Sequence, residues 1–252
     1  MATLPKAGLL SLPLPVSSRD RSDLARVQCL EVLAACIVNE LDQSLPAVTL
    51  NADACVRMLS PHTLNLEGAR DKALRTAQSA NRAAAAMRRL WALFAKTDAN
   101  DESVDLNEVV REVLALSVQE LQLRRVAVRQ ALAANLPRIA GDPYQLQQAI
   151  LNLVENAAEA MSEIHDRPRE LIVKTESRDG HVHLSVRDSG AGFKSRDSHR
   201  LFDPFYTTKR DGMGIGLFLS RWIIENHRGS VCAALNDGPG ATFSLSIPCQ
   251  AS

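Results

Sequence analysis

Apolar residues between positions 27 and 94 recur at spacings of three and four, the period of an α-helix with one buried face. Two such runs flank a Ser-Pro-His-Thr segment at 60–63, and they predict two long antiparallel helices. The first run contains Val27, Leu30, Ala34, Ile37, Leu41, Val48 and Cys55, interrupted by Ser44 and Asn51; the second contains Ala69, Ala73, Thr76, Ala80, Ala83, Met87, Leu90 and Phe94.

Two helices of this length cannot bury both apolar stripes by themselves. We therefore expect the hairpin to dimerise and to form a four-helix bundle. Packing of the stripes against the rest of the same chain remains the alternative.

The second half of the chain contains a segment with the pattern of an amphipathic helix and a segment with the pattern of a strand. Residues 147–161 have helical periodicity and present Asn152 and Asn156 one turn apart on the same face. An alternating run from His181 to Val186 predicts a strand that ends at Asp188. A helical asparagine pair alone is more often a surface or capping feature, so its significance depends on the segments that follow.

Two glycine-rich segments come after the asparagine helix. They read Asp-Ser-Gly-Ala-Gly-Phe at 188–193 and Gly-Met-Gly-Ile-Gly-Leu at 212–217. Glycines let the backbone adopt positive φ and approach a nucleotide closely, and N–H groups at a helix start favour phosphate. Either segment alone could be a plain turn.

In this order, and with Leu-Phe-Asp-Pro-Phe-Tyr-Thr-Thr-Lys at 201–209 between them, these segments resemble the nucleotide-binding module of sensor histidine kinases. They correspond to the N, G1, F and G2 boxes of that family. With the closing Gly-Ala-Thr-Phe at 240–243, the resemblance covers roughly the last 150 residues. The sequences of these motifs are most similar to those of the branch that includes nitrogen-regulation and oxygen-sensing kinases.

The resemblance implies an α+β chain with two domains, which a length of 252 residues accommodates. We expect a disordered, proline-containing N-terminus at 1–19 and a dimerising antiparallel helical hairpin at 20–97. Residues 98–252 would form the catalytic domain, an α/β two-layer sandwich in which a mixed sheet carries helices on one face and binds ATP.

The same resemblance implies ATP and Mg²⁺ as cofactors. Asn156 would be the magnesium ligand, because Mg²⁺ accepts one side-chain oxygen together with phosphate oxygens and water. Asp188 would accept the adenine amino group. The other expected nucleotide contacts are Asn152, Gly190, Gly192, Phe193, Thr207, Thr208, Lys209, Gly212, Gly214, Gly216, Leu217 and Thr242. Lys209 and Arg210 could contact the γ-phosphate or be solvated surface charges.

Position 152 distinguishes among relatives with the same ATP-binding fold. In gyrase, the ninety-kilodalton heat-shock protein and MutL, a glutamate one turn before the magnesium asparagine acts as a general base for water. Asn152 stands there in this chain and cannot accept a proton. Phosphoryl transfer to a protein is therefore favoured over ATP hydrolysis.

The first helix contains a changed acceptor motif. Kinases of this branch carry one motif, His-Glu-(Leu/Ile)-Asn-Gln-Pro-Leu, in which the third residue is leucine or isoleucine. This chain instead reads Asn-Glu-Leu-Asp-Gln-Ser-Leu-Pro at 39–46. Asn39 replaces the histidine and is not a usable nucleophile. It lies about 200° around the helix from Ile37 and Leu41 and is expected to face outward. Glu40 would be the proton acceptor in an active relative, and Gln43 could orient a water.

Composition agrees with a regulatory protein. The chain has 29 basic and 29 acidic residues, so no electrostatic footprint for nucleic acid is present. It shows no signal peptide and no apolar stretch long enough to span a membrane, so we expect a cytoplasmic protein. The histidines lack metal-site spacing, and the five cysteines include no Cys-x-x-Cys pair and read as reduced.

Three functions are compatible with these observations. The first is a kinase that phosphorylates a histidine in trans on another chain. The second is a pseudokinase that acts as a scaffold, inhibitor or phosphatase on a response regulator or partner histidine kinase. The third, a serine kinase of the mitochondrial or anti-sigma type, is disfavoured by the acceptor-motif remnant at 40–43. The expected assembly is a homodimer through the hairpin.

Overall fold

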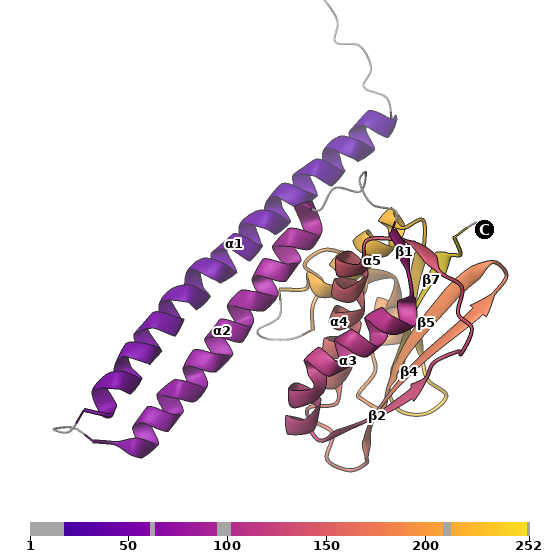
Figure 1. Ribbon diagram of the computed structural model, residues 1–252. Helices are drawn as coiled ribbons and strands as arrows, with labels where there is room; N and C mark the ends of the chain where they lie inside the picture. Colours follow the sequence, from indigo (N-terminus) through magenta and orange to yellow (C-terminus); the bar gives the residue numbers. More distant parts are fainter. Residues whose placement is uncertain (1–17, 61–63, 95–101, 209–212, 251–252) are drawn as a thin grey trace, which may run out of the picture.

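The computed structural model describes residues 18–60, 64–94, 102–208 and 213–250 (Figure 1). Two long helices, α1 (Ser18–Met58) and α2 (Leu66–Phe94), form an antiparallel hairpin, as the periodicity predicts. The second domain packs beside α2. Residues 1–17 of the predicted disordered segment lie outside the described residues, and α1 begins at Ser18.

The hairpin is held together by large aliphatic side chains on α1 and small ones on α2. Leu33, Ile37 and Leu41 of α1 are buried, and so is Ser44, which had looked like an interruption of the stripe. The buried residues of α2 are Ala69, Ser79, Ala83 and Ala86. Small residues let the two backbones approach closely, so the α1 side chains fill the space between the helices.

The face of α2 that packs on α1 differs in part from the predicted stripe. Ala73, Ala80 and Met87 are exposed, whereas Ser79 and Ala86 are buried in their place. Alanines occur all round this helix, so apolar spacing does not distinguish the face that packs on α1 from a face available to a second hairpin. The side chains of Val27 and Phe94 lie outside the described set.

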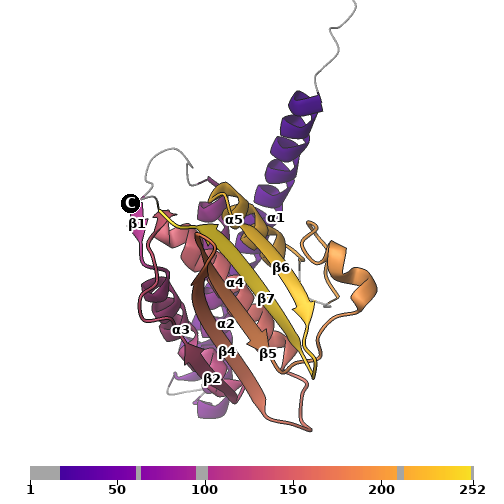
Figure 2. The ribbon, with the colours of Figure 1, turned by 90° about the vertical axis from the view of Figure 1, so that its right-hand side faces the viewer.

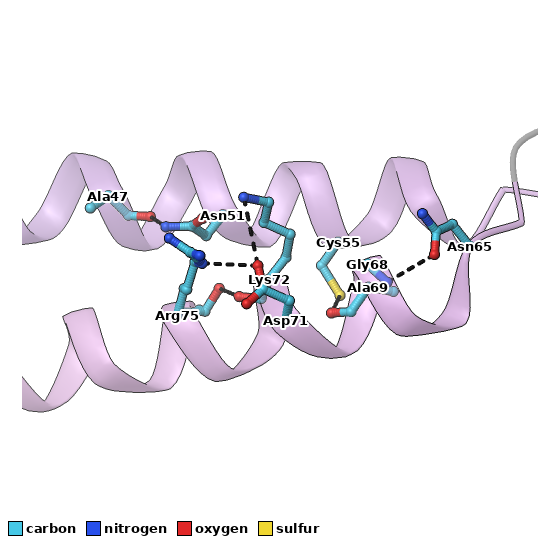
Figure 3. Close-up of polar contacts among 10 residues, drawn as sticks. Ala47, Asn51, Cys55, Asn65, Gly68, Ala69, Asp71, Lys72 and Arg75 are labelled. Atoms are coloured by element: carbon cyan, nitrogen blue, oxygen red, sulfur yellow. Dashed lines mark hydrogen bonds and ion pairs between the residues drawn. The ribbon is translucent and has the colours of Figure 1, made fainter.

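Polar contacts fasten the hairpin near its closed end (Figure 3). The Cys55 thiol of α1 donates a hydrogen bond to the Ala69 carbonyl of α2 over 3.3 Å. The Asn65 side chain accepts from the Gly68 N–H at 2.8 Å and thereby caps the start of α2. These contacts fix where α2 begins relative to α1.

The second domain contains a five-stranded mixed sheet in the order β2-β4-β5-β7-β6. Its strands are β2 (Val126–Ala131), β4 (Arg169–Arg178), β5 (His181–Asp188), β6 (Ser230–Leu235) and β7 (Ala241–Pro248). Only the β2–β4 pair is parallel. A separate two-stranded sheet pairs β1 (Glu102–Val104) with β3 (Ile139–Gly141).

Helices α3 (Leu106–Leu123), α4 (Pro143–Ala160) and α5 (Gly216–Asn226) cover one face of the sheet (Figure 2). Alternate residues of β5 and β7, such as Leu184 and Leu245, are buried against these helices. The N-caps Asp105 and Asp142 accept backbone N–H bonds at the starts of α3 and α4. The predicted hairpin followed by a two-layer α/β sandwich is confirmed.

Burial of the sheet can be tested with two leucines of opposite exposure. Leu184 in β5 is fully buried, whereas Leu123 at the end of α3 is 85% exposed. Leu184→Ala should lower the free energy of unfolding by about 2–5 kcal/mol because it leaves a cavity under the helices. Leu123→Ala should change it by less than about 0.5 kcal/mol. Urea unfolding measures both, and equal effects would contradict the described packing.

Candidate functional site

A cavity of about 550 Å³ lies between α4, the loop after β5 and the start of α5. A short 3₁₀-helix at Ser195–Arg200 and the chain around Tyr206 complete its wall. Its lining residues are Arg89, Asn156, Glu159, Ala191, Gly192, Phe193, Lys194, Asp197, Leu201, Tyr206, Thr207, Thr208, Met213, Gly214, Ile215, Gly216 and Leu217. Segments far apart in sequence, including all the glycine-rich ones, therefore meet at one place.

The two asparagines of α4 have different positions relative to the cavity. Asn156 lines it. Asn152 is buried one turn earlier, where its Oδ1 accepts from Gln148 Nε2 at 2.8 Å and its Nδ2 donates to the Gly216 carbonyl at 3.1 Å. Asn152 thus uses both halves of its amide within the protein, and its nitrogen joins α4 to α5, whereas Asn156 is the asparagine that lines the cavity.

The start of α5 is suited to an anion. Its N-cap position is Ile215, which has no side chain that accepts a hydrogen bond, and no side chain caps the helix. The first N–H groups of a helix lack intrahelical partners and favour negative charge. Gly216 and Leu217, which open α5, line the cavity. The helix start is therefore placed to bind phosphate.

Gly214 lets the chain before α5 pass close to the preceding loop. Its φ is +67°, and a Cβ there would lie 2.6 Å from the Tyr206 carbonyl oxygen. The Gly214 carbonyl in turn accepts the Phe205 N–H at 3.0 Å. Only glycine combines this φ with this approach, so the cavity wall depends on it.

Asp188 is a buried carboxylate at the end of β5 that accepts backbone hydrogen bonds. One carboxylate oxygen, Oδ1, accepts N–H bonds from Gly190 at 2.8 Å and from Ala241 at 3.3 Å. Burial raises the pKa of Asp188 above its ordinary value, while these two N–H donors lower it. The carboxylate lies directly before the loop whose residues Ala191 and Gly192 line the cavity.

Thr242 is connected to Asp188 through the side chain of Asn236. Its hydroxyl donates to Asn236 Oδ1 at 2.7 Å, and Asn236 Nδ2 donates to the Asp188 carbonyl at 2.9 Å. Thr242 therefore orients the strand end that carries Asp188. Asn236 had no signal in the sequence that would have placed it in this network.

Some of the remaining predicted contacts line the cavity, and others lie outside the described residues. Phe193, Thr207 and Thr208 line the cavity. The Phe193 ring also packs on Phe243 of β7, with 6.3 Å between centroids. Lys209, Arg210 and Gly212 lie outside the described residues.

The predicted acceptor motif, residues 39–46, lies on α1. Asn39 and Gln43 are exposed, as the helical phase predicts for position 39. Glu40 is half-buried, and its carboxylate pairs with the Arg89 guanidinium at 2.9 Å. Arg89 also lines the cavity, so this pair joins the motif to the site. Sequence reasoning missed Arg89 because nothing in α2 signals proximity to segments more distant along the chain.

The residues present fit a magnesium nucleotide. Asn156 would supply one neutral oxygen and the start of α5 would supply N–H groups, while Gly214 lets the chain before α5 pass close to the Tyr206 segment of the cavity wall. In the part of the chain that the structure describes, no group of three His, Cys, Asp or Glu side chains could hold a metal ion by itself. A metal here would need oxygens from its ligand.

Comparisons with known proteins agree with this geometry. Residues 141–251 match the sequence model of the family described as histidine kinase-, DNA gyrase B-, and HSP90-like ATPase. The sensor protein FixL of Bradyrhizobium diazoefficiens is 34% identical over 230 residues. That match covers 89% of this chain and 45% of FixL, so the chain spans less than half of this relative.

Solved structures show the same arrangement. The catalytic domain of the histidine kinase ThkA is 30% identical, with a TM-score of 0.53, and the match covers 59% of this chain and 95% of that domain. ThkA in complex with the response regulator TrrA has a TM-score of 0.62 and 22% identity over 92% of this chain and 65% of that one. The latter match extends the likeness in fold to the hairpin. Among the described residues, no helix is both long and apolar enough to span a membrane.

Gly214 and Gly238 provide a matched test of the cavity wall. Gly214→Ala should cost about 1–3 kcal/mol of unfolding free energy because alanine must adopt φ near +67° and meet the Tyr206 carbonyl. A Cβ on Gly238 meets no atom within 4 Å, so Gly238→Ala should be nearly neutral. Thermal unfolding compares the two, and equal shifts would count against the described loop.

Asp188→Asn tests the electrostatics of the β5 end. Because its pKa is higher in the folded than in the unfolded chain, the Asp188 carboxyl adds stability below the unfolded pKa. This contribution is lost as the pH rises through the folded pKa. An asparagine oxygen can accept the same two N–H bonds without a charge. The variant should therefore gain stability relative to wild type as the pH rises above the unfolded pKa of an aspartate, about 4. Urea unfolding as the pH is raised measures the difference, and a relative loss would contradict the burial argument.

Proposed function

Because this chain belongs to the sensor histidine kinase family, with its ATPase domain behind a helical hairpin, we propose that it transfers the γ-phosphoryl group of ATP to a histidine of another chain. The observation that carries the proposal is the cavity where Asn156, Gly214 and the uncapped start of α5 come together. This cavity combines a side-chain amide oxygen suited to Mg²⁺ with N–H donors suited to phosphate.

Each part of the nucleotide has a counterpart in this chain. The N–H groups at the start of α5 would bind the phosphates, and Asp188 would accept the adenine amino group through the oxygen not shared with Gly190 and Ala241. Asn156 would hold Mg²⁺, which supplies charge neutralisation of the phosphates when bound. Phe193, Thr207 and Thr208 would complete the contacts, and Lys209 stays a prediction for the γ-phosphate.

Transfer is favoured over hydrolysis by the environment of Asn152. The position that holds a general base in hydrolytic relatives here carries an amide, and both its polar atoms are used within the protein. An amide neither accepts a proton from water nor is free to reorient at this place. The γ-phosphoryl group would therefore await a protein acceptor.

The acceptor would be supplied in trans. Asn39 is exposed where related kinases carry histidine, and its amide is not a nucleophile. We propose a homodimer formed through exposed apolar residues of the hairpin, which include Val38, Leu45, Leu74, Met87 and Trp91. A response regulator or a partner histidine kinase would be the other partner, in keeping with the ThkA complex. The cytoplasmic location stays a prediction.

A pseudokinase is the second candidate, favoured by the state of the acceptor motif. Glu40 is engaged by Arg89, and Gln43 is exposed one turn beyond Asn39. In this version ATP controls conformation, and Gln43 orients a water toward a phosphorylated regulator. The protein would then act as a scaffold, inhibitor or phosphatase.

Phosphoryl transfer separates the two candidates. The chain, with Mg²⁺ and γ-labelled ATP, is mixed with an acceptor that carries Asn39→His together with Asn156→Ala. Label on this acceptor is expected, because Asn39→His restores a nucleophile while Asn156→Ala removes its own magnesium ligand. The acceptor incubated alone is the control and should stay unlabelled. Absence of label with ATP binding retained would leave the pseudokinase.

A further inference from the structure

Among the described side chains of α2, Arg89 alone lines the cavity, and it is held by a carboxylate from α1. Its Nη2 lies 2.9 Å and 3.1 Å from the two Glu40 carboxylate oxygens, and its Nε donates to the Ala85 carbonyl at 3.3 Å. The side chains of Arg89 and Glu40 are 17% and 22% exposed. The Arg89 side chain is thus largely buried and also lines the cavity.

Arg89 and Asn156 line the same cavity, although they lie on different helices, α2 and α4, which pack against each other. A nucleotide bound with its phosphates toward Asn156 would therefore share this cavity with the Arg89 side chain.

We propose that Arg89 binds the phosphates of the nucleotide and that Glu40 competes with them for its guanidinium. This inference rests on the proposed ATP binding and deepens it, because it adds a cation from the hairpin to a site otherwise made by the second domain. No glycine-rich or aromatic segment of the nucleotide module contains this residue.

The chemistry of the three groups makes such an exchange favourable. A guanidinium presents a planar fork of N–H donors that matches a phosphate as well as a carboxylate. Glu40 offers one negative charge, whereas a triphosphate offers several. A bound triphosphate would draw Arg89 away and release the Glu40 carboxylate next to position 39. By linkage, whatever displaces Glu40 would strengthen ATP binding to the same degree.

Binding measurements on three variants test the exchange. The probes are Mg²⁺-ATP and adenosine, each competing with a fluorescent ATP analogue. Arg89→Ala should weaken ATP at least about 10-fold while changing adenosine less than about 2-fold, because only ATP carries phosphates. Arg89→Lys should fall between wild type and Arg89→Ala. Glu40→Gln should tighten ATP about 3-fold or more, because the competing charge is gone.

Arg88→Ala is the matched control, since Arg88 is exposed, adjacent on α2 and lines a different cavity with Trp91. It should leave ATP affinity within about 2-fold of wild type. Unchanged ATP affinity of Arg89→Ala, equal weakening of ATP and adenosine, or weaker ATP binding by Glu40→Gln would each overturn the inference. A wild-type protein that bound no ATP would instead remove the proposed function itself.

Discussion

The side-chain amide of Asn152 joins the two helices between which the cavity lies. Its oxygen accepts from Gln148 within α4, and its nitrogen donates to the first residue of α5. A buried amide with both halves satisfied stabilises the structure, whereas loss of either partner would leave a buried polar group unpaired. The register of α5 against α4, and hence the position of its N–H groups relative to Asn156, depends on this contact.

A second set of polar contacts places the opposite wall. Asp188 accepts the Ala241 N–H at the start of β7 and the Gly190 N–H of the loop after β5, and Asn236 donates to its backbone carbonyl. A Cβ on Gly240 would lie 2.0 Å from that carbonyl oxygen, which is why only glycine stands there. The cavity therefore lies between two buried polar networks, one on the helices and one at the sheet end.

Sequence reasoning recovered the elements well where the pattern has one clear period. The apolar stripe of the first predicted helix corresponds to α1, and the alternating run at 181–186 corresponds to β5. Residues of both glycine-rich segments line one cavity. It could not assign the buried face of α2, because alanine satisfies both a buried and an exposed position. It also could not find Arg89 or Asn236, whose partners are 49 and 48 residues away in the chain. Such pairs exist only once the chain has folded, and periodicity carries no information about them.

The alanine and serine surface of α2 has a mechanical consequence. Alanine has no side-chain rotamers. A shift of α1 along α2 would therefore require no change of side-chain rotamer at Ala83 and Ala86. The Cys55 and Glu40 side chains of α1 bond to α2, so a shift of one helix along the other would have to break these polar contacts. Helix displacements of an ångström or two are a common way for proteins to carry signals. In this hairpin, such a displacement would separate Glu40 from Arg89 and so change the charge at the cavity wall.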